Sequence, residues 1–141
     1  MSIWKQNPTL DGLNALNHNT MGAAIGLEFT EIGPDFMEAT MPVDHRTVQP
    51  MGLLHGGASV ALAETLGSVA GVLVLEDTQR QAVVGVEINA NHLRSVRKGK
   101  VTGRVSPIRL GRKIQVWRIV IRDDQDRQVC ESRLTTMVID I

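Results

Sequence analysis

The sequence predicts an α+β domain in which an antiparallel sheet of about six strands wraps around one long central helix, with a short helix near the N-terminus. Segments in which apolar and polar residues alternate come as a pair before residue 50 and as four more after residue 80, as expected for half-buried antiparallel strands. Between them, apolar residues recur at helical spacing, and Leu62, Leu66, Val69 and Leu73 fall on one side.

Length and composition restrict the class of protein. The 141 residues suit one domain with a real core, and 15 Lys plus Arg balance 15 Asp plus Glu, so no net field attracts nucleic acid or a membrane. The single cysteine, Cys130, excludes an intrachain disulfide and a cysteine metal cluster and fits a reducing compartment. Because the first residues also lack the apolar core of a signal peptide, we expect a cytoplasmic protein.

The N-terminal part is expected to form a short helix and then a hairpin. Residues 9–17 carry leucines at positions 10, 13 and 16 and begin at Pro8-Thr9, which indicates a helix. Residues 27–32 and 37–43 read as strands joined by a turn at Gly33-Pro34-Asp35. A hairpin therefore precedes the central helix.

Residues 42–57 form a connection that is long for a compact domain, which favours a functional role. This loop contains Gln49, Met51 and His55, and it ends at the adjacent glycines Gly56 and Gly57, where the helix of residues 57–75 is expected to begin. Helix N-termini have unpaired N–H groups, and glycine lets a substrate approach the backbone closely.

The C-terminal half is expected to supply four strands, at residues 82–93, 99–106, 113–122 and 128–139. In the first of them, strict alternation places two sets of side chains on opposite faces. One set is Val84, Val86, Ile88 and Ala90, and the other is Gly85, Glu87, Asn89 and Asn91.

Glu64 is the only charged residue between Arg46 and Glu76, and we expect it to be largely removed from water. It shares its side of the helix with small residues, namely Gly57, Ala61, Ser68 and Gly71. Buried carboxylates are costly and often functional, although a purely structural hydrogen bond is the alternative. An acid together with N–H groups for an oxyanion provides two parts of an acyl-transfer site.

The chain resembles a known family in its motifs. These are Pro42-Val43-Asp44, Gln49-Pro50, Leu54-His55-Gly56-Gly57, Ala63-Glu64 and Asn89-Ala90-Asn91-His92-Leu93-Arg94. Together they resemble the hotdog-fold acyl-CoA thioesterases, and they are most similar to the bacterial branch that contains the 1,4-dihydroxy-2-naphthoyl-CoA thioesterase of menaquinone synthesis and the 4-hydroxybenzoyl-CoA thioesterases.

The resemblance implies a hotdog fold and hydrolysis of aromatic or medium-size acyl-CoA thioesters to free acid and coenzyme A. It implies no cofactor, and a homodimer with shared active sites, commonly paired into a homotetramer. Acyl-carrier-protein thioesters are the other substrate form in this family.

The resemblance also assigns roles to residues. The N–H of Gly56 would polarise the thioester carbonyl, and Glu64 would attack it or activate a water molecule. Gln49, His55 and Ser68 would orient the thioester or the water. The expected substrate-binding and coenzyme A-binding residues are His92, Arg94, Arg112, Lys113, Met51 and Gly85.

A basic segment supports the coenzyme A contacts. Residues 88–122 contain ten Lys or Arg and no Asp or Glu. Turns can gather the charges of residues 94–98 and 111–113, and guanidinium groups suit the phosphates of coenzyme A. The other arginines are expected to spread over a solvated sheet face.

Several alternatives remain at this point. The sequence has no GxSxG, HExxH or phosphate-loop motif, and Ser59 or Ser68 would need a histidine base to act as a nucleophile. A zinc site of His55, His92 and Glu64 matches no metal-binding spacing. Thioester dehydration by His55 is a further option, as is a non-catalytic acyl-CoA or carrier-protein binding module, which would not need Glu64.

The spacing of Gly56 and Glu64 predicts a site shared by two subunits. Eight residues of helix separate them by about 12 Å, whereas reacting groups must lie about 3 Å apart. A second copy of the helix, antiparallel across a two-fold axis, would bring its N-terminus beside Glu64. The alternative is a monomer in which the loop before Gly56 contacts the carbonyl.

Overall fold

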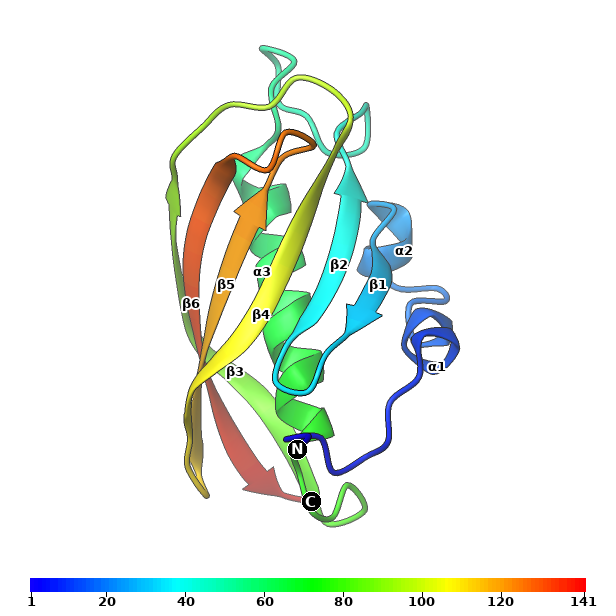
Figure 1. Ribbon diagram of the computed structural model, residues 1–141, viewed down its shortest axis with the longest axis vertical. Helices are drawn as coiled ribbons and strands as arrows, with labels where there is room; N and C mark the ends of the chain where they lie inside the picture. The colour runs from blue at the N-terminus through cyan, green and yellow to red at the C-terminus, as the bar shows by residue number, and fades with distance from the viewer.

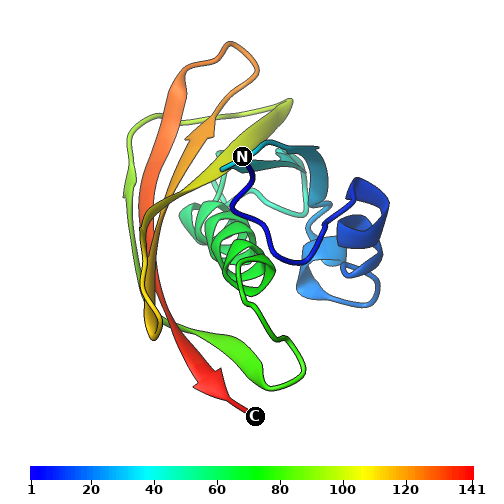
Figure 2. The ribbon, with the colours of Figure 1, turned by 60° about the horizontal axis from the view of Figure 1, so that its bottom comes forward.

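The computed structural model describes residues 1–141 and confirms the predicted α+β hotdog architecture (Figure 1). The helices are α1 (Leu10–Ala15), α2 (Met21–Ala24) and α3 (Gly56–Leu73). The strands are β1 (Glu28–Ile32), β2 (Met37–Pro42), β3 (Gln81–His92), β4 (Lys100–Leu110), β5 (Ile114–Arg122) and β6 (Gln128–Asp140). They form one antiparallel sheet in the order β1-β2-β4-β5-β6-β3, and the curved sheet holds α3 on its concave side (Figure 2).

The core lies between α3 and the sheet. Leu62, Leu66 and Ala70 of the helix are fully buried, as are Trp117 and Leu134 of the central strands. By length and composition, α3 is the one helix that could cross a membrane. Here its apolar face is instead covered by the sheet.

One residue of α3 faces differently from the sequence prediction. Val69 packs against the core as predicted, although it is only partly buried, whereas Gly71 is buried against the sheet and not on the open side. A Cβ at Gly71 would lie 2.6 Å from Oε1 of Gln115 and 3.0 Å from Val83. Because the curved sheet extends around the side of α3 near Gly71, this side of the helix is buried there.

The N-terminal segment packs across the end of the core. The predicted first helix is confirmed as α1, with Thr9 as its N-cap, but it is shorter than expected. Helix α2, which has only four residues, was not predicted because it is too short to show a period. Trp4 stacks on Trp117 with ring centroids 6.4 Å apart and donates a hydrogen bond to the carbonyl of Gly33.

Strand β3 departs from strict alternation. Gly85 pairs with Thr136 and Glu87 with Thr135, so Val86 is an extra residue in a β-bulge. Before the bulge Gly85 faces α3, and after it Ile88 and Ala90 pack on the core, whereas Val84 and Val86 are exposed. The prediction that Gly85 shares a face with Glu87 and that Val84 shares one with Ile88 is therefore wrong.

The two edges of the sheet differ in accessibility. The outer edge of β1 is occupied by Asn14 of α1, whose amide donates to the carbonyl of Phe29 at 3.0 Å and accepts from its N–H at 2.8 Å. Asn17 donates to the carbonyl of Leu27 in the same way. The opposite edge, formed by the 12 residues of β3, has no such cover within the chain.

Candidate active site

The candidate site begins at the first turn of α3, which has one free backbone donor. His55 caps the helix, since its backbone is extended and its Nδ1 accepts a hydrogen bond from the N–H of Gly57 at 2.8 Å. The carbonyl of His55 accepts from the N–H groups of Ala58 and Ser59 at 3.0 and 3.2 Å. Only the N–H of Gly56 has no acceptor among the first four of the helix. The N–H of Gly56 is thus the one backbone donor at the positive end of the helix dipole that remains available to a ligand.

A cavity of about 350 Å³ opens beside this N–H group. It lies between the loop before α3, the first turn of α3 and the residues that follow β3. Its wall includes Gln49, Gly56, Ser59, His92 and Arg94. Four of the predicted site residues therefore meet in one chain, and Ser59 joins them as a residue to which the sequence assigned no binding role.

A tight turn fixes Gln49 in this wall. The N–H of Gly52 donates to the carbonyl of Gln49 at 2.8 Å, and Gly52 has a φ of +76°, which glycine adopts at little cost. Oε1 of Gln49 accepts a hydrogen bond from the N–H of Met51. The NH₂ group of Gln49 is left as a donor for a ligand, and Met51 stands at the tip of the turn with 72% of its surface exposed.

His92 packs against the backbone of Gly56. A Cβ at position 56 would lie 2.8 Å from Nε2 and 3.2 Å from Cδ2 of the imidazole, closer than side chains normally pack. Glycine is therefore required at position 56 for His92 to lie over the helix N-terminus. The role of His55 differs from that of His92, because Nδ1 of His55 is already used in the helix cap and only its Nε2 remains available.

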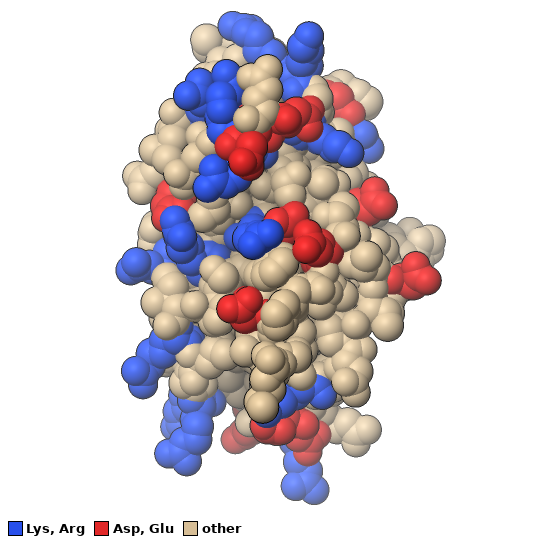
Figure 3. Space-filling model, in the orientation of Figure 1, with Lys and Arg blue, Asp and Glu red and all other residues tan.

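Arg94 opens an exposed basic segment at one end of the molecule. Lys and Arg side chains gather there, over the connection from β3 to β4 (Figure 3). By contrast, Arg104 and Arg118 lie on the outer sheet face and pair with Glu38 and Glu131, each at 2.8 Å. Residues 94–98 are thus gathered as expected, and Arg104 and Arg118 are dispersed over the sheet face as expected.

Glu64 lies on the open side of α3, two turns beyond the cavity. It is less buried than the sequence suggested, with intermediate exposure. Burial nevertheless raises the pKa of its carboxyl, and no hydrogen bond or cation offsets that effect. Gly85 lies directly beside it, because a Cβ at position 85 would collide with Oε1 of Glu64. Ser68 follows one turn later and is partly exposed. Glu64, Ser68 and Gly85 form a second group of candidate residues.

Arg112 and Lys113 are not brought to either group within one chain. They lie in the turn between β4 and β5, and the length of β4 separates that turn from the Arg94 segment by on the order of 30 Å. Arg112 instead lines a separate cavity of about 410 Å³ at the C-terminal end of α3, together with Ile3 and Lys5.

The arrangement bears on the alternative chemistries. No three His, Cys, Asp or Glu side chains gather in a way that could hold a metal ion, and Glu64 lies far from His55 and His92 along the helix. Ser59 and His92 line the same cavity. However, no hydrogen bond joins them in the chain, so His92 is not positioned as a base for a serine nucleophile.

Comparison with known proteins shows what the whole chain is similar to. The thioesterase superfamily matches residues 51–130. The chain is 55% identical over 137 residues to the 1,4-dihydroxy-2-naphthoyl-CoA hydrolase of Escherichia coli K12, covering 97% of this chain and 99% of that one. It is 56% identical over 136 residues to the proofreading thioesterase EntH of Cronobacter turicensis, covering 96% and 98%. The crystal structure of a thioesterase from Haemophilus influenzae superposes with a TM-score of 0.94 at 57% identity, covering 98% and 95%.

Proposed function

The chain belongs to the thioesterase superfamily, and we propose that it hydrolyses aromatic acyl-CoA thioesters at active sites shared by two subunits. It is a thioester hydrolase that acts on acyl-CoA. Within that activity, the similarity to the Escherichia coli enzyme supports 1,4-dihydroxy-2-naphthoyl-CoA or a hydroxybenzoyl-CoA as substrate. The observation that carries the site assignment is the free N–H of Gly56 at the wall of the cavity.

In the proposed mechanism, the thioester carbonyl accepts a hydrogen bond from the N–H of Gly56. Charge that develops on the carbonyl oxygen is stabilised by this donor and by the helix dipole. Glu64 of the partner subunit then acts in one of two ways. It takes a proton from a water molecule that attacks the carbonyl carbon, or it attacks directly and forms an anhydride that water hydrolyses. In both cases the carbon–sulfur bond breaks, and coenzyme A leaves as a thiolate that takes up a proton.

The remaining site residues would orient these groups. The free NH₂ group of Gln49 is a donor for the thioester or the water, and Nε2 of His55 is a second group in reach of the same loop. His92 and Arg94 would contact the coenzyme A arm, with Arg94 toward its phosphates. Ser68 of the partner subunit would position the acyl group or the water beside Glu64.

The case for two subunits rests on the separation of the two groups of residues. Gly56 and Glu64 are eight residues apart in one straight helix, about 12 Å. The edge of β3 offers the surface for a partner. It is 12 residues long, it passes beside Glu64 at Gly85, and its bulged residue Val86 exposes 56% of its surface. Uncovered edges of this kind pair with another strand, and the edge of β1 is already blocked by Asn14.

A two-fold axis beside β3 would run the two α3 helices antiparallel. The first turn of one α3 would then face Glu64 of the other, and Arg112 and Lys113 of the partner subunit would move toward the Arg94 end of the first. This arrangement would explain why residues assigned to one ligand lie at opposite ends of a single chain.

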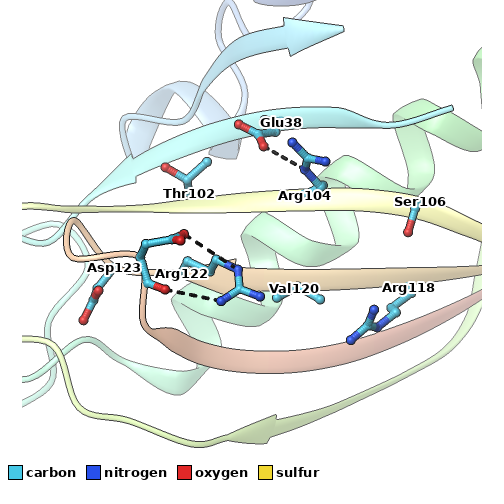
Figure 4. A pocket seen from close by; sticks show the side chains of 9 residues that line it. Glu38, Thr102, Arg104, Ser106, Arg118, Val120, Arg122 and Asp123 are labelled. Carbon is cyan, nitrogen blue, oxygen red and sulfur yellow. Dashed lines mark hydrogen bonds and ion pairs between the residues drawn. The ribbon is translucent and has the colours of Figure 1, made fainter. Parts of the chain in front are cut away.

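We further propose that two such dimers form a homotetramer through the outer sheet face. That face has exposed apolar side chains on β3, β5 and β6, and the strand register places Val84, Met137 and Ile114 side by side. The outer face also has a hollow lined by Arg104, Arg118 and Arg122, in which Arg104 pairs with Glu38 (Figure 4). A surface with apolar groups and both signs of charge can be complementary to a second copy of itself. Light scattering would show a mass of four chains, and a monomer would refute both assembly proposals.

The substrate would bind mainly against aliphatic side chains. The chain has no tyrosine, and Trp4, Trp117 and Phe29 are buried. Comparison of kcat/KM for benzoyl-, hydroxynaphthoyl- and straight-chain acyl-CoA therefore tests the aromatic assignment, which a preference for straight chains would refute. We place the enzyme in the cytoplasm, in keeping with a single, buried thiol at Cys130.

Subunit hybrids test the shared site directly. Glu64→Gln keeps the shape of the side chain and should lower kcat by about 10² or more, whereas Gly56→Val should block the opposite half of the site. The two inactive chains are co-expressed with different tags and purified as a hybrid dimer. The hybrid should regain about half of the wild-type activity per dimer, because one of its sites carries both changes and the other carries neither. Inactive hybrids of verified composition would place both groups in the site of one chain.

A further inference from the structure

Ser59 is a buried polar residue in the cavity wall that has no part in the mechanism above. It is only 1% exposed, and it lies on the sheet side of the first turn of α3. Thr65, lower in the same helix, turns its hydroxyl back to the carbonyl of Ala61 at 2.7 Å. The hydroxyl of Ser59 makes no such bond and has no other partner within the chain.

The unpaired hydroxyl must be directed at the cavity. No fully buried side-chain nitrogen or oxygen of the chain lacks a hydrogen-bond partner. The Ser59 oxygen therefore accounts for part of the small area that this residue exposes, and that area belongs to the cavity. Buried hydroxyls without a partner are rare because they are costly, so this one is suited to a ligand or to water.

We propose that the Ser59 hydroxyl hydrogen-bonds the pantetheine amide nearest to the sulfur when an acyl thioester occupies this cavity. The inference rests on the proposed function for the identity of the ligand. Ser59 is three residues after Gly56, and side chains at this spacing are neighbours about 5–6 Å apart on a helix. In an acyl-CoA, two CH₂ groups separate the sulfur from the first amide. A thioester whose carbonyl meets the N–H of Gly56 thus carries an amide past Ser59.

The chemistry of the two groups matches. A serine hydroxyl can donate to the amide carbonyl or accept from the amide N–H. Leu54, Leu93 and Val129 of the same wall are apolar and offer no side-chain hydrogen bond to the amide. Unlike Arg94, which would recognise the phosphates at the far end of coenzyme A, Ser59 would recognise the part of the arm that every pantetheine thioester shares.

A paired deletion in enzyme and substrate tests the bond. Ser59→Ala should lower kcat/KM for the thioester of N-acetylcysteamine, which keeps the amide, by about five- to tenfold. The same variant should leave kcat/KM unchanged for the matching S-butyl thioester, which has no amide. Ser59→Cys fills the space but is a weak donor, so it should resemble Ser59→Ala. Thr30→Ala, which removes an exposed hydroxyl on β1 away from the cavity, is the matched control and should change neither value.

The outcomes separate the bond from packing. Equal losses on both thioesters, recovery of activity in Ser59→Cys, or no loss at all would each overturn the proposal. If the wild-type protein hydrolyses neither truncated thioester, kcat/KM for the full acyl-CoA decides separately whether the proposed function holds. Ser59 is then judged by calorimetric titration with coenzyme A, where Ser59→Ala should weaken binding by about the same factor. Unaltered affinity, or no binding by the wild-type protein, would overturn the assignment.

Discussion

Gly85→Ala should separate catalysis from folding, because Gly85 contacts the proposed catalytic carboxylate and little else. The added methyl group would overlap Oε1 of Glu64, which is the only group it would meet at short range. A carboxylate end is flexible and partly exposed, so it can move aside at little cost in stability. A displacement on the order of 1 Å, however, can lower the rate of a positioned reaction by about 10². The backbone at Gly85 is not in the left-handed region, so alanine itself causes no strain there.

Gly67→Ala is the matched control for Gly85→Ala. Its methyl group would overlap Leu134, a fully buried side chain in the core, and would meet no proposed site residue. We expect Gly67→Ala to lower Tm and to keep most of the activity of the folded protein at low temperature. Gly85→Ala should show the reverse, with kcat reduced by about 10- to 100-fold and Tm nearly unchanged. Full turnover in a folded Gly85→Ala protein would mean that the position of Glu64 does not limit the reaction.

Two further predictions concern charge. Glu64→Gln should raise Tm at pH 7. Burial raises the pKa of the Glu64 carboxyl above 4.5 in the folded protein, so the stability that the neutral carboxyl contributes is fully present below pH 4.5. That stability is lost as the pH rises through the folded pKa and the carboxyl ionises, whereas Gln stays neutral. In thermal melts, the difference in Tm between Glu64→Gln and the wild-type protein should disappear below pH 4.5. A difference in Tm that does not change with pH would exclude titration of Glu64 as its cause. Arg94→Ala should raise KM for acyl-CoA more than for the acyl-pantetheine thioester, whereas equal increases would show that Arg94 does not contact the nucleotide phosphates.

The local pattern of the sequence was sufficient to predict which residues are buried where one element packs on one neighbour. In β2, Met37, Ala39 and Met41 alternate with polar residues, and all three are fully buried as predicted. The start of α3 was predicted within one residue because His55 and the adjacent glycines mark it chemically. These features depend on residues that are close together in the chain, so the order of residues in the sequence is enough to predict them.

The pattern failed where a long-range contact changes the register. In β3, Val86 is exposed and Ile88 packs on the core, although strict alternation puts both on one face. With the bulge at Val86, the strand passes close to Glu64 at Gly85 and packs on the core at Ile88 and Ala90. Gly85 permits that close passage, but an isolated glycine in a strand does not reveal which side chain it faces.

The same distinction applies to the site. Sequence spacing alone implied that Gly56 and Glu64 could not meet in one chain, and the structure agrees, since the cavity at Gly56 excludes Glu64 from its wall. Which edge of the sheet could receive a partner was not readable from spacing, because it depends on Asn14 folding back onto Phe29. With the edge of β1 occupied, β3 is the remaining edge, and it is the one beside Glu64. In the proposed dimer, the contact between Asn14 and Phe29 therefore restricts pairing between sheet edges to β3.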